Sequence, residues 1–205
     1  MIETIEGNTL VISGTMPGLP LFREHPEGIT RLEFRNCVFT NSGPICINDI
    51  FRDWKELKEV VGYDELIIPH VYSADSIFEG CTNLERVDLR KLKIPGLYSA
   101  QSAFKDCINL KEVFLDEFEV DEYTECIAAH VFENCPKLEF IFAPCVKFDY
   151  LIYSDRISFE YKNYHDPYDG FKGCDYINKH YGDYSGAEMM FYMLKDRGFK
   201  IRDNS

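Results

Sequence analysis

Apolar residues return along this chain in blocks of nearly constant length. Each block can be aligned on a phenylalanine, and the successive spacings are 27, 26, 28 and 39 residues for Phe51, Phe78, Phe104, Phe132 and Phe171. Within a block, apolar residues follow at offsets of three, six, nine and eleven, as in "FKDCINLKEVFL" at 104–115. Repetition at a period of roughly 20 to 50 residues is typical of a solenoid, in which similar units stack along one axis.

The offsets hold side chains of one type in successive blocks. At the third offset the residue is mostly cysteine: Trp54, Cys81, Cys107, Cys135 and Cys174. At the sixth it is aliphatic: Leu57, Leu84, Leu110, Leu138 and Ile177. At the ninth it is β-branched: Val60, Val87, Val113 and Ile141. The pattern fails at His180 in the last block, and an earlier block without the phenylalanine, "ITRLEFRNCVF" at 29–39, fits the same frame.

Each block is expected to form one coil of a stack. Apolar residues three apart share one face of a helical or tight turn, and the following x-Val-x-Leu alternation predicts a short strand with alternate residues buried. A second apolar pair, such as Leu92 and Ile94, would close the coil on its far side. Since no coil can bury its own apolar face, neighbouring coils must do so. The extra residue between Val60 and Leu66 predicts a bulge near Gly62.

The sequence therefore predicts an α/β repeat solenoid with a parallel sheet on one face, in a single domain. Its three parts are an N-terminal cap with a strand in "NTLVISG", the repeats, and a C-terminal section with a tyrosine-rich insertion, a degenerate repeat and a cap, at residues 1–28, 29–148 and 149–205. A helical C-terminal cap is expected in "SGAEMMFYMLKDRG", because Ser185 and Glu188 form a capping box and Gly198 is a typical stop.

The repeat resembles the leucine-rich repeats of bacterial surface-antigen (BspA-like) proteins, which have an Ala-Phe-x-x-Cys-x-x-Leu-x-x-Ile/Val core. "AFKDCINLKEV" at 103–113 is close to that core, and the resemblance covers roughly residues 29–148. It implies a leucine-rich-repeat-like stack and a binding or adhesion module without catalytic residues. The chain departs from the surface-exposed members by its short array and by an N-terminus without a secretory signal, which argues against adhesion.

Charge narrows the choice of partner. The chain has 35 acidic and 22 basic side chains and a formal net charge of −13. Binding to nucleic-acid phosphates needs clustered lysine and arginine, so direct nucleic-acid binding is not expected, whereas a basic protein partner is compatible. The same charge also serves solubility. Because the apolar runs are far shorter than a membrane span and no signal peptide is visible, we expect a cytoplasmic protein.

The residues capable of chemistry form no familiar catalytic or metal-binding motif. The eight cysteines include no Cys-x-x-Cys pair, and those that recur once per block are expected to be buried, reduced thiols. Cys126 and His130 are four residues apart and could share a helical face, a spacing that chance also supplies. We therefore expect no enzymatic activity, no cofactor and no bound metal.

The candidate binding surface is the outward row of the predicted sheet. It comprises the residues that alternate with the buried ones in the later coils: Tyr63, Arg86, Asp88, Arg90, Glu112, Phe114, Asp116, Phe140 and Phe142. Exposed aromatic rings indicate a contact surface, unless the C-terminal tyrosine-rich segment folds over them. An acidic patch, for which the alternative is a solvated edge, adds further carboxylates to this region: Glu117, Glu119, Asp121, Glu122 and Glu125.

Two functions are compatible with these features. The first is a non-enzymatic protein-binding leucine-rich-repeat module that uses the exposed sheet face and the acidic patch. The alternative is a small acidic intracellular inhibitor, of phage or virus type, that blocks a basic nucleic-acid-handling or defence protein of the host. The first function predicts that aromatic anchors dominate binding, and the second predicts that the acidic patch does.

Overall fold

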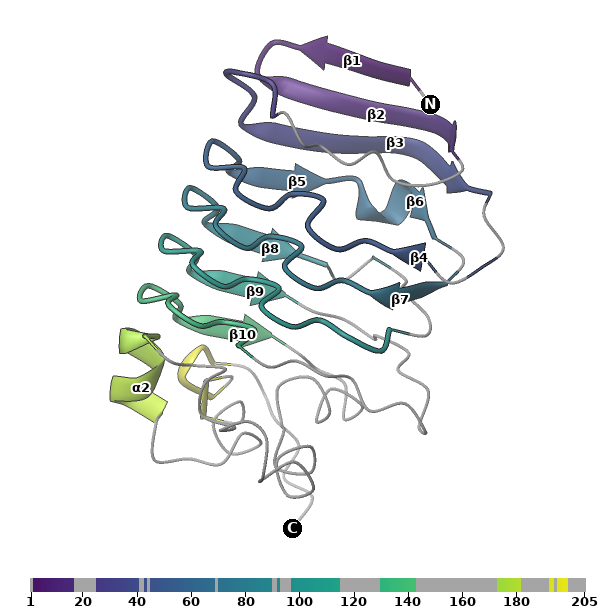
Figure 1. The fold of residues 1–205 in the computed structure, drawn as a ribbon. Helices are drawn as coiled ribbons and strands as arrows, with labels where there is room; N and C mark the ends of the chain where they lie inside the picture. Colours follow the sequence, from purple (N-terminus) through teal and green to yellow (C-terminus); the bar gives the residue numbers. More distant parts are fainter. Residues whose placement is uncertain are drawn as a thin grey trace.

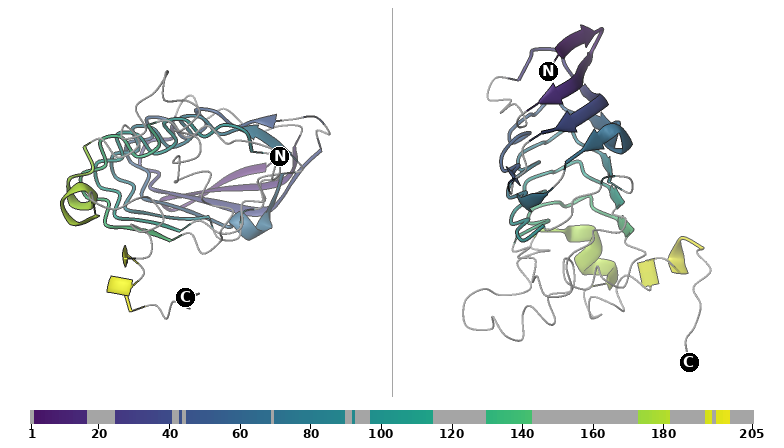
Figure 2. Two further views of the ribbon diagram at one scale, coloured as in Figure 1. Left: turned by 90° about the horizontal axis from the view of Figure 1, so that it is seen from below. Right: turned by 90° about the vertical axis from the view of Figure 1, so that its right-hand side faces the viewer.

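Short strands lie one above another along the length of the molecule (Figure 1). This computed structural model describes residues 2–16, 25–40, 43, 45–68, 70–89, 92, 97–114, 130–142, 173–181, 192–193 and 195–198. Within these residues the chain is mostly β, with little helix, and parallel strands stack through about four turns of a solenoid-like structure. The view along the stack shows successive coils following nearly the same path (Figure 2). The predicted repeat solenoid is thus confirmed at this level.

The N-terminal end is a β-hairpin joined to a long parallel pair. β1 (Ile2–Glu6) runs antiparallel to β2 (Thr9–Met16), and β2 pairs in parallel with β3 (Arg31–Phe39). The strand predicted in "NTLVISG" is present in β2. All five side chains of β1 are exposed, so β1 is an additional edge strand that lies beyond the core.

The remaining strands are short and pair in parallel. β3 also pairs with β5 (Glu59–Val61) and with β6 (Leu66–Ile67). A second sheet has the order β10 (Phe140–Phe142), β9 (Glu112–Phe114), β8 (Arg86–Asp88). A two-stranded sheet joins β4 (Ile45–Cys46) and β7 (Val71–Ser73). The β-branched residues at the ninth offset occupy the centres of β5, β8, β9 and β10 and are buried, as predicted: Val60, Val87, Val113 and Ile141.

The segments between phenylalanine and leucine are turns and not helices. The Cys107 N–H donates to the Phe104 carbonyl, 3.2 Å away, and the Leu110 N–H donates to the Cys107 carbonyl, 2.9 Å away. Two residues after each phenylalanine the backbone has a positive φ, between 59° and 74°, at Asp53, Gly80, Asp106 and Asn134. Because this left-handed conformation stops a helix after one turn, the expected α/β composition was too rich in helix.

The few helical segments lie outside these turns. The bulge predicted near Gly62 is instead a single 3₁₀ turn, η1 (Tyr63–Glu65), which takes up the extra residue between β5 and β6. At the C-terminal end, α2 (Asp175–Tyr181) follows Cys174 (Figure 1). Of the helix predicted over 185–198, positions 192–193 and 195–196 are helical, and the part before residue 192 lies outside the described residues.

The repeat phenylalanines form one continuous aromatic column through the core. The ring centroids are 5.1 Å apart for Phe51 and Phe78, 5.5 Å for Phe78 and Phe104, and 5.4 Å for Phe104 and Phe132. All four rings are buried. This column explains why the sequence repeats phenylalanine at one offset: each ring is the packing surface of the next coil.

A second column consists of thiols. Each donates to the main-chain carbonyl of the phenylalanine in the preceding coil, with Sγ–O distances of 3.0, 3.1, 3.0 and 2.9 Å for Cys81, Cys107, Cys135 and Cys174. All four thiols are free and buried, which confirms the prediction of reduced core cysteines. Cysteine suits this offset because it fills a small apolar space and still satisfies a carbonyl that water cannot reach.

Alkylation of the native protein should modify Cys46 and leave Cys81 and Cys107 unmodified. Cys46 is exposed, whereas burial raises the pKa of Cys81 to about 12 and raises the pKa of Cys107 well above its ordinary value. With a pKa near 12, roughly one thiol in ten thousand is the reactive thiolate at about pH 8. Iodoacetamide treatment followed by peptide mass spectrometry tests this. The urea-unfolded chain is the control, and native labelling of Cys107 as fast as of Cys46 would contradict the buried column.

Candidate functional site

The outward side chains of the sheets form a column of alternating charge. Arg31 of β3 pairs with Glu59 of β5, with 3.0 Å between Nε and Oε2. Arg86 of β8 faces Glu112 of β9 at 3.9 Å. Opposite charges on adjacent strands attract, and like charges directly opposite would be destabilising. The column therefore favours this register of the strands over one that places like charges opposite each other, and it leaves a mixed-charge face rather than a uniformly acidic one.

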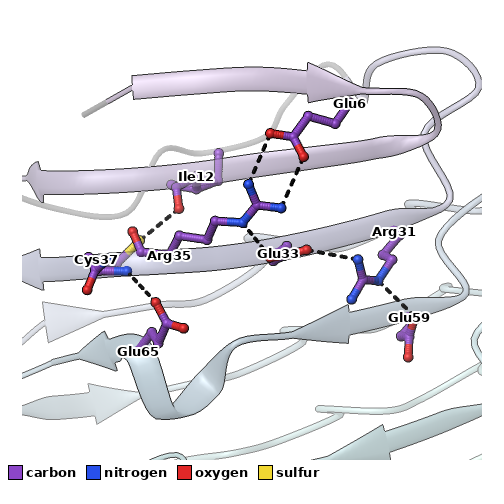
Figure 3. Close-up of polar contacts among 9 residues, drawn as sticks. Glu6, Ile12, Arg31, Glu33, Arg35, Cys37, Glu59 and Glu65 are labelled. Carbon is purple, nitrogen blue, oxygen red and sulfur yellow. Dashed lines mark hydrogen bonds and ion pairs between the residues drawn. The ribbon is translucent and has the colours of Figure 1, made fainter.

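At the N-terminal end this column widens into a closed cluster of ion pairs (Figure 3). The Arg35 guanidinium donates to both carboxylate oxygens of Glu6, at 3.0 Å each, and also to Glu33. Glu33 accepts a further hydrogen bond from Arg31 at 2.8 Å, and Arg31 reaches Glu59. The hydrogen bond from Arg35 is the main cause that lowers the pKa of Glu33. Because Arg35 bonds to both Glu6 and Glu33, this cluster ties β1 to β3.

The late coils combine carboxylates with aromatic rings. The Arg86 guanidinium carbon lies 4.4 Å from the centroid of the Phe114 ring, and the same side chain is 3.4 Å from an Asp88 carboxylate oxygen. Phe114 is half-buried and meets Phe140 edge to face, with 5.7 Å between centroids. Four of the predicted surface residues, Arg86, Asp88, Glu112 and Phe114, are thus brought together on one face.

Two of the predicted surface residues are buried, and for them the expectation of exposure was wrong. Tyr63 is 6% exposed, because the 3₁₀ turn directs its ring inward against Phe34, with 6.3 Å between ring centroids. Burial raises the pKa of the Tyr63 phenol well above its ordinary value. Phe140 is 2% exposed although it belongs to the outward row; the Arg197 guanidinium lies over its ring at 4.6 Å, and the Phe114 ring meets it edge to face.

The contact of Arg197, a residue near the C-terminus, with the sheet face was not anticipated from the sequence. The Arg197 guanidinium donates to a Glu112 carboxylate oxygen at 2.9 Å and lies 3.7 Å from Glu139. It sits 85 residues from Glu112 in the chain, so no local spacing connects the two. The alternative that the tyrosine-rich segment folds over the sheet face stays a prediction, because most of that segment lies outside the described residues and Arg197 lies beyond it in the chain.

Several predicted residues lie outside the described part of the chain. They are two residues of the sheet row and the whole acidic patch: Arg90, Asp116, Glu117, Glu119, Asp121, Glu122 and Glu125. The main chain of Phe142 is in β10. Of the pair Cys126 and His130, only His130 is described, and its Nδ1 lies 3.2 Å from Glu133.

The turns carry two further columns of alternating charge that sequence reasoning overlooked. Residues at the first offset alternate between positive and negative charge along the stack: Arg52, Glu79, Lys105 and Glu133. Arg52 forms an ion pair with Glu79 at 3.1 Å, and Lys105 forms one with Glu133 at 2.9 Å. Residues at the seventh offset alternate in charge in the same way: Lys58, Glu85, Lys111 and Glu139. Lys111 forms an ion pair with Glu85 at 2.8 Å. The alternation of charge is visible in the sequence once the blocks are aligned. It favours the stacking of each coil against the neighbours that it has in the structure.

In the part of the chain that the structure describes, no group of three or more His, Cys, Asp or Glu side chains could hold a metal ion. The same residues include no helix that is long and apolar enough to cross a membrane. Comparison of the chain with protein-family models, with curated proteins and with solved structures found no match.

Proposed function

We propose that this protein is a non-enzymatic binding module for a basic protein segment, and that the late sheet face on β8, β9 and β10 is its contact surface. One observation carries the proposal: Asp88, Glu112 and Phe114 place carboxylates beside a partly buried ring, and this combination already holds the Arg86 guanidinium. The same chemistry would recognise cationic side chains of a partner, and the net charge of −13 would speed their approach.

The scaffold beneath this face supports a binding role. Parallel strands hold their outward residues about 4.8 Å apart, and the fully buried Val113 and Ile141 fix β9 and β10 from below. A preorganised surface loses little conformational freedom on binding. The buried thiols donate to carbonyls, which supports a structural rather than a nucleophilic role for them. A leucine-rich-repeat-like stack with a helical C-terminal cap is part of this proposal.

The test compares proteins captured by the wild type with those captured by Phe114→Ala. Truncating a central aromatic anchor should weaken binding by about 2 kcal/mol or more, mainly through faster dissociation. Tyr72→Ala is the matched control, because Tyr72 is a 43% exposed aromatic residue on β7, in a different sheet. A partner that is lost with Phe114→Ala and retained with Tyr72→Ala supports the proposal. A partner that both variants retain equally contradicts it.

Salt dependence then separates this function from the acidic-inhibitor alternative. In titrations with the captured partner, binding by the sheet face should lose only a little affinity when the salt concentration is raised from low to physiological. The inhibitor mode should show a collapse of affinity, because exposed charges are screened over about 8 Å at physiological ionic strength. Charge reversal at Glu119, Asp121, Glu122 and Glu125 should then weaken binding more than Phe114→Ala does.

A further inference from the structure

The Arg197 guanidinium occupies a distinct position at the end of the sheet face. It contacts the Glu112 carboxylate at 2.9 Å, the Glu139 carboxylate at 3.7 Å and the Phe140 ring at 4.6 Å. We call Glu112, Glu139 and Phe140 the guanidinium seat. The outward column alternates between positive and negative side chains as far as Glu112, and β10 continues it with the uncharged Phe140. Arg197 therefore supplies, from elsewhere in the chain, the positive charge that this column lacks at its last strand.

The composition of the seat is specific for arginine. A planar guanidinium can stack on an aromatic face and donate in its own plane to carboxylates at the same time, which a lysine ammonium cannot do. The neighbouring strands repeat the arrangement, because Arg86 stacks on Phe114 and lies near Asp88 and Glu112. The late sheet face thus consists of two adjacent seats of the same chemistry, both filled by arginines of the chain itself.

The two arginines are held differently. Arg86 belongs to β8, within the stack, whereas Arg197 is supplied by the C-terminal segment and its side chain is 39% exposed. Its partners Glu112 and Glu139 are 27% and 44% exposed, and ion pairs with this exposure contribute little to stability. The segment itself is anchored by Met193, which is 1% exposed and belongs to the core. The Arg197 side chain can therefore leave the seat while the segment stays in place.

We propose that the guanidinium seat receives an arginine of the protein partner, and that Arg197 is an internal competitor that occupies the seat until the partner arrives. The inference rests on the proposed function and makes it more specific: the partner is an arginine-bearing segment and not merely a basic one. If Arg197 fills the seat about nine-tenths of the time, removing it strengthens arginine binding about tenfold, since apparent affinity scales with the free fraction of the site.

The test uses two fluorescent peptides of equal charge, a glycine-arginine repeat and the matching glycine-lysine repeat, titrated by fluorescence polarisation. Arg197→Gln should bind the arginine peptide about five- to tenfold more tightly than the wild type, and should bind the lysine peptide less than twofold more tightly. Arg52→Gln is the matched control, because it removes the same charge from an exposed arginine that pairs with Asp49 and Glu79 in the turns. Its affinity for both peptides should stay within twofold of the wild type.

Two further variants complete the design. In the Arg197→Gln background, Glu112→Gln together with Glu139→Gln should abolish the gain in affinity for the arginine peptide. Thermal unfolding of each variant checks that the fold is retained. An unchanged affinity in Arg197→Gln, an equal gain in Arg52→Gln, an equal gain for the lysine peptide, or no measurable binding of either peptide would each overturn the proposal.

Failure of the seat is distinguishable from failure of the proposed function. If capture of a partner depends on Phe114 but the peptides do not respond to Arg197→Gln, the sheet face binds and the seat is wrong. If the peptides respond as expected but no partner depends on Phe114, the seat exists and the sheet-face function is wrong.

Discussion

Replacing Leu110 by alanine should lower the free energy of unfolding by roughly 2–5 kcal/mol. Leu110 is 0% exposed and occupies the sixth offset, between Leu84 and Leu138 of the adjoining coils, which are also 0% exposed. A cavity at this position removes contacts with coils on both sides, and the close-packed neighbours can collapse into it only partly. Urea unfolding monitored by circular dichroism measures the change.

Ile108→Ala is the matched control for this experiment. Ile108 lies in the same coil, two residues earlier, and is 40% exposed, so its truncation removes a similar volume without leaving a closed cavity. We expect Ile108→Ala to lower the free energy of unfolding by less than about 1 kcal/mol. Equal losses for the two variants would show that the assignment of inward and outward positions in this coil is wrong.

Most of the buried positions could be predicted from the sequence because burial in a solenoid is periodic. Once Phe104, Cys107, Leu110 and Val113 are aligned with their counterparts, every coil repeats the same contacts, and all four are buried. Periodicity does not distinguish a helical turn from a tight turn, since both bring residues three apart onto one face. The distinguishing signal is the second offset, where residues that tolerate a positive φ recur: Asp53, Gly80, Asp106, Asn134 and Gly173.

The exposure of a residue on the sheet face could be predicted only where the conformation of its own coil decides it. Arg86, Asp88 and Glu112 lie on the outward face, because strand alternation alone sets their direction. Tyr63 does not, since the one-residue insertion changes the local conformation and turns the ring inward. Phe140 follows the alternation and is nevertheless buried, and one of the groups over its ring is the Arg197 guanidinium, which comes from a distant segment. Contacts between distant segments leave no periodic trace in a single sequence.

Gly62→Ala should lower the free energy of unfolding by roughly 4 kcal/mol or more. Gly62 has a φ of 79°, a conformation that costs about 1–2 kcal/mol for an L side chain. In addition, a Cβ at this position would lie 2.1 Å from the main-chain carbonyl oxygen of Phe34. That oxygen belongs to β3, which pairs with β2, β5 and β6, so it cannot move aside without disturbing the N-terminal sheet.

Gly28→Ala separates the two causes of this loss. Gly28 has a nearly identical φ of 75°, but a Cβ there would meet nothing within 4 Å. Gly28→Ala should therefore lower the free energy of unfolding only by the cost of the left-handed backbone conformation, about 1–2 kcal/mol. Thermal and urea unfolding of both variants, with the soluble yield as a second measurement if Gly62→Ala does not fold, give the difference caused by the contact with Phe34. Equal destabilisation of the two variants would mean that β3 does not approach the chain at Gly62, and the placement of η1 between β5 and β6 would be wrong with it.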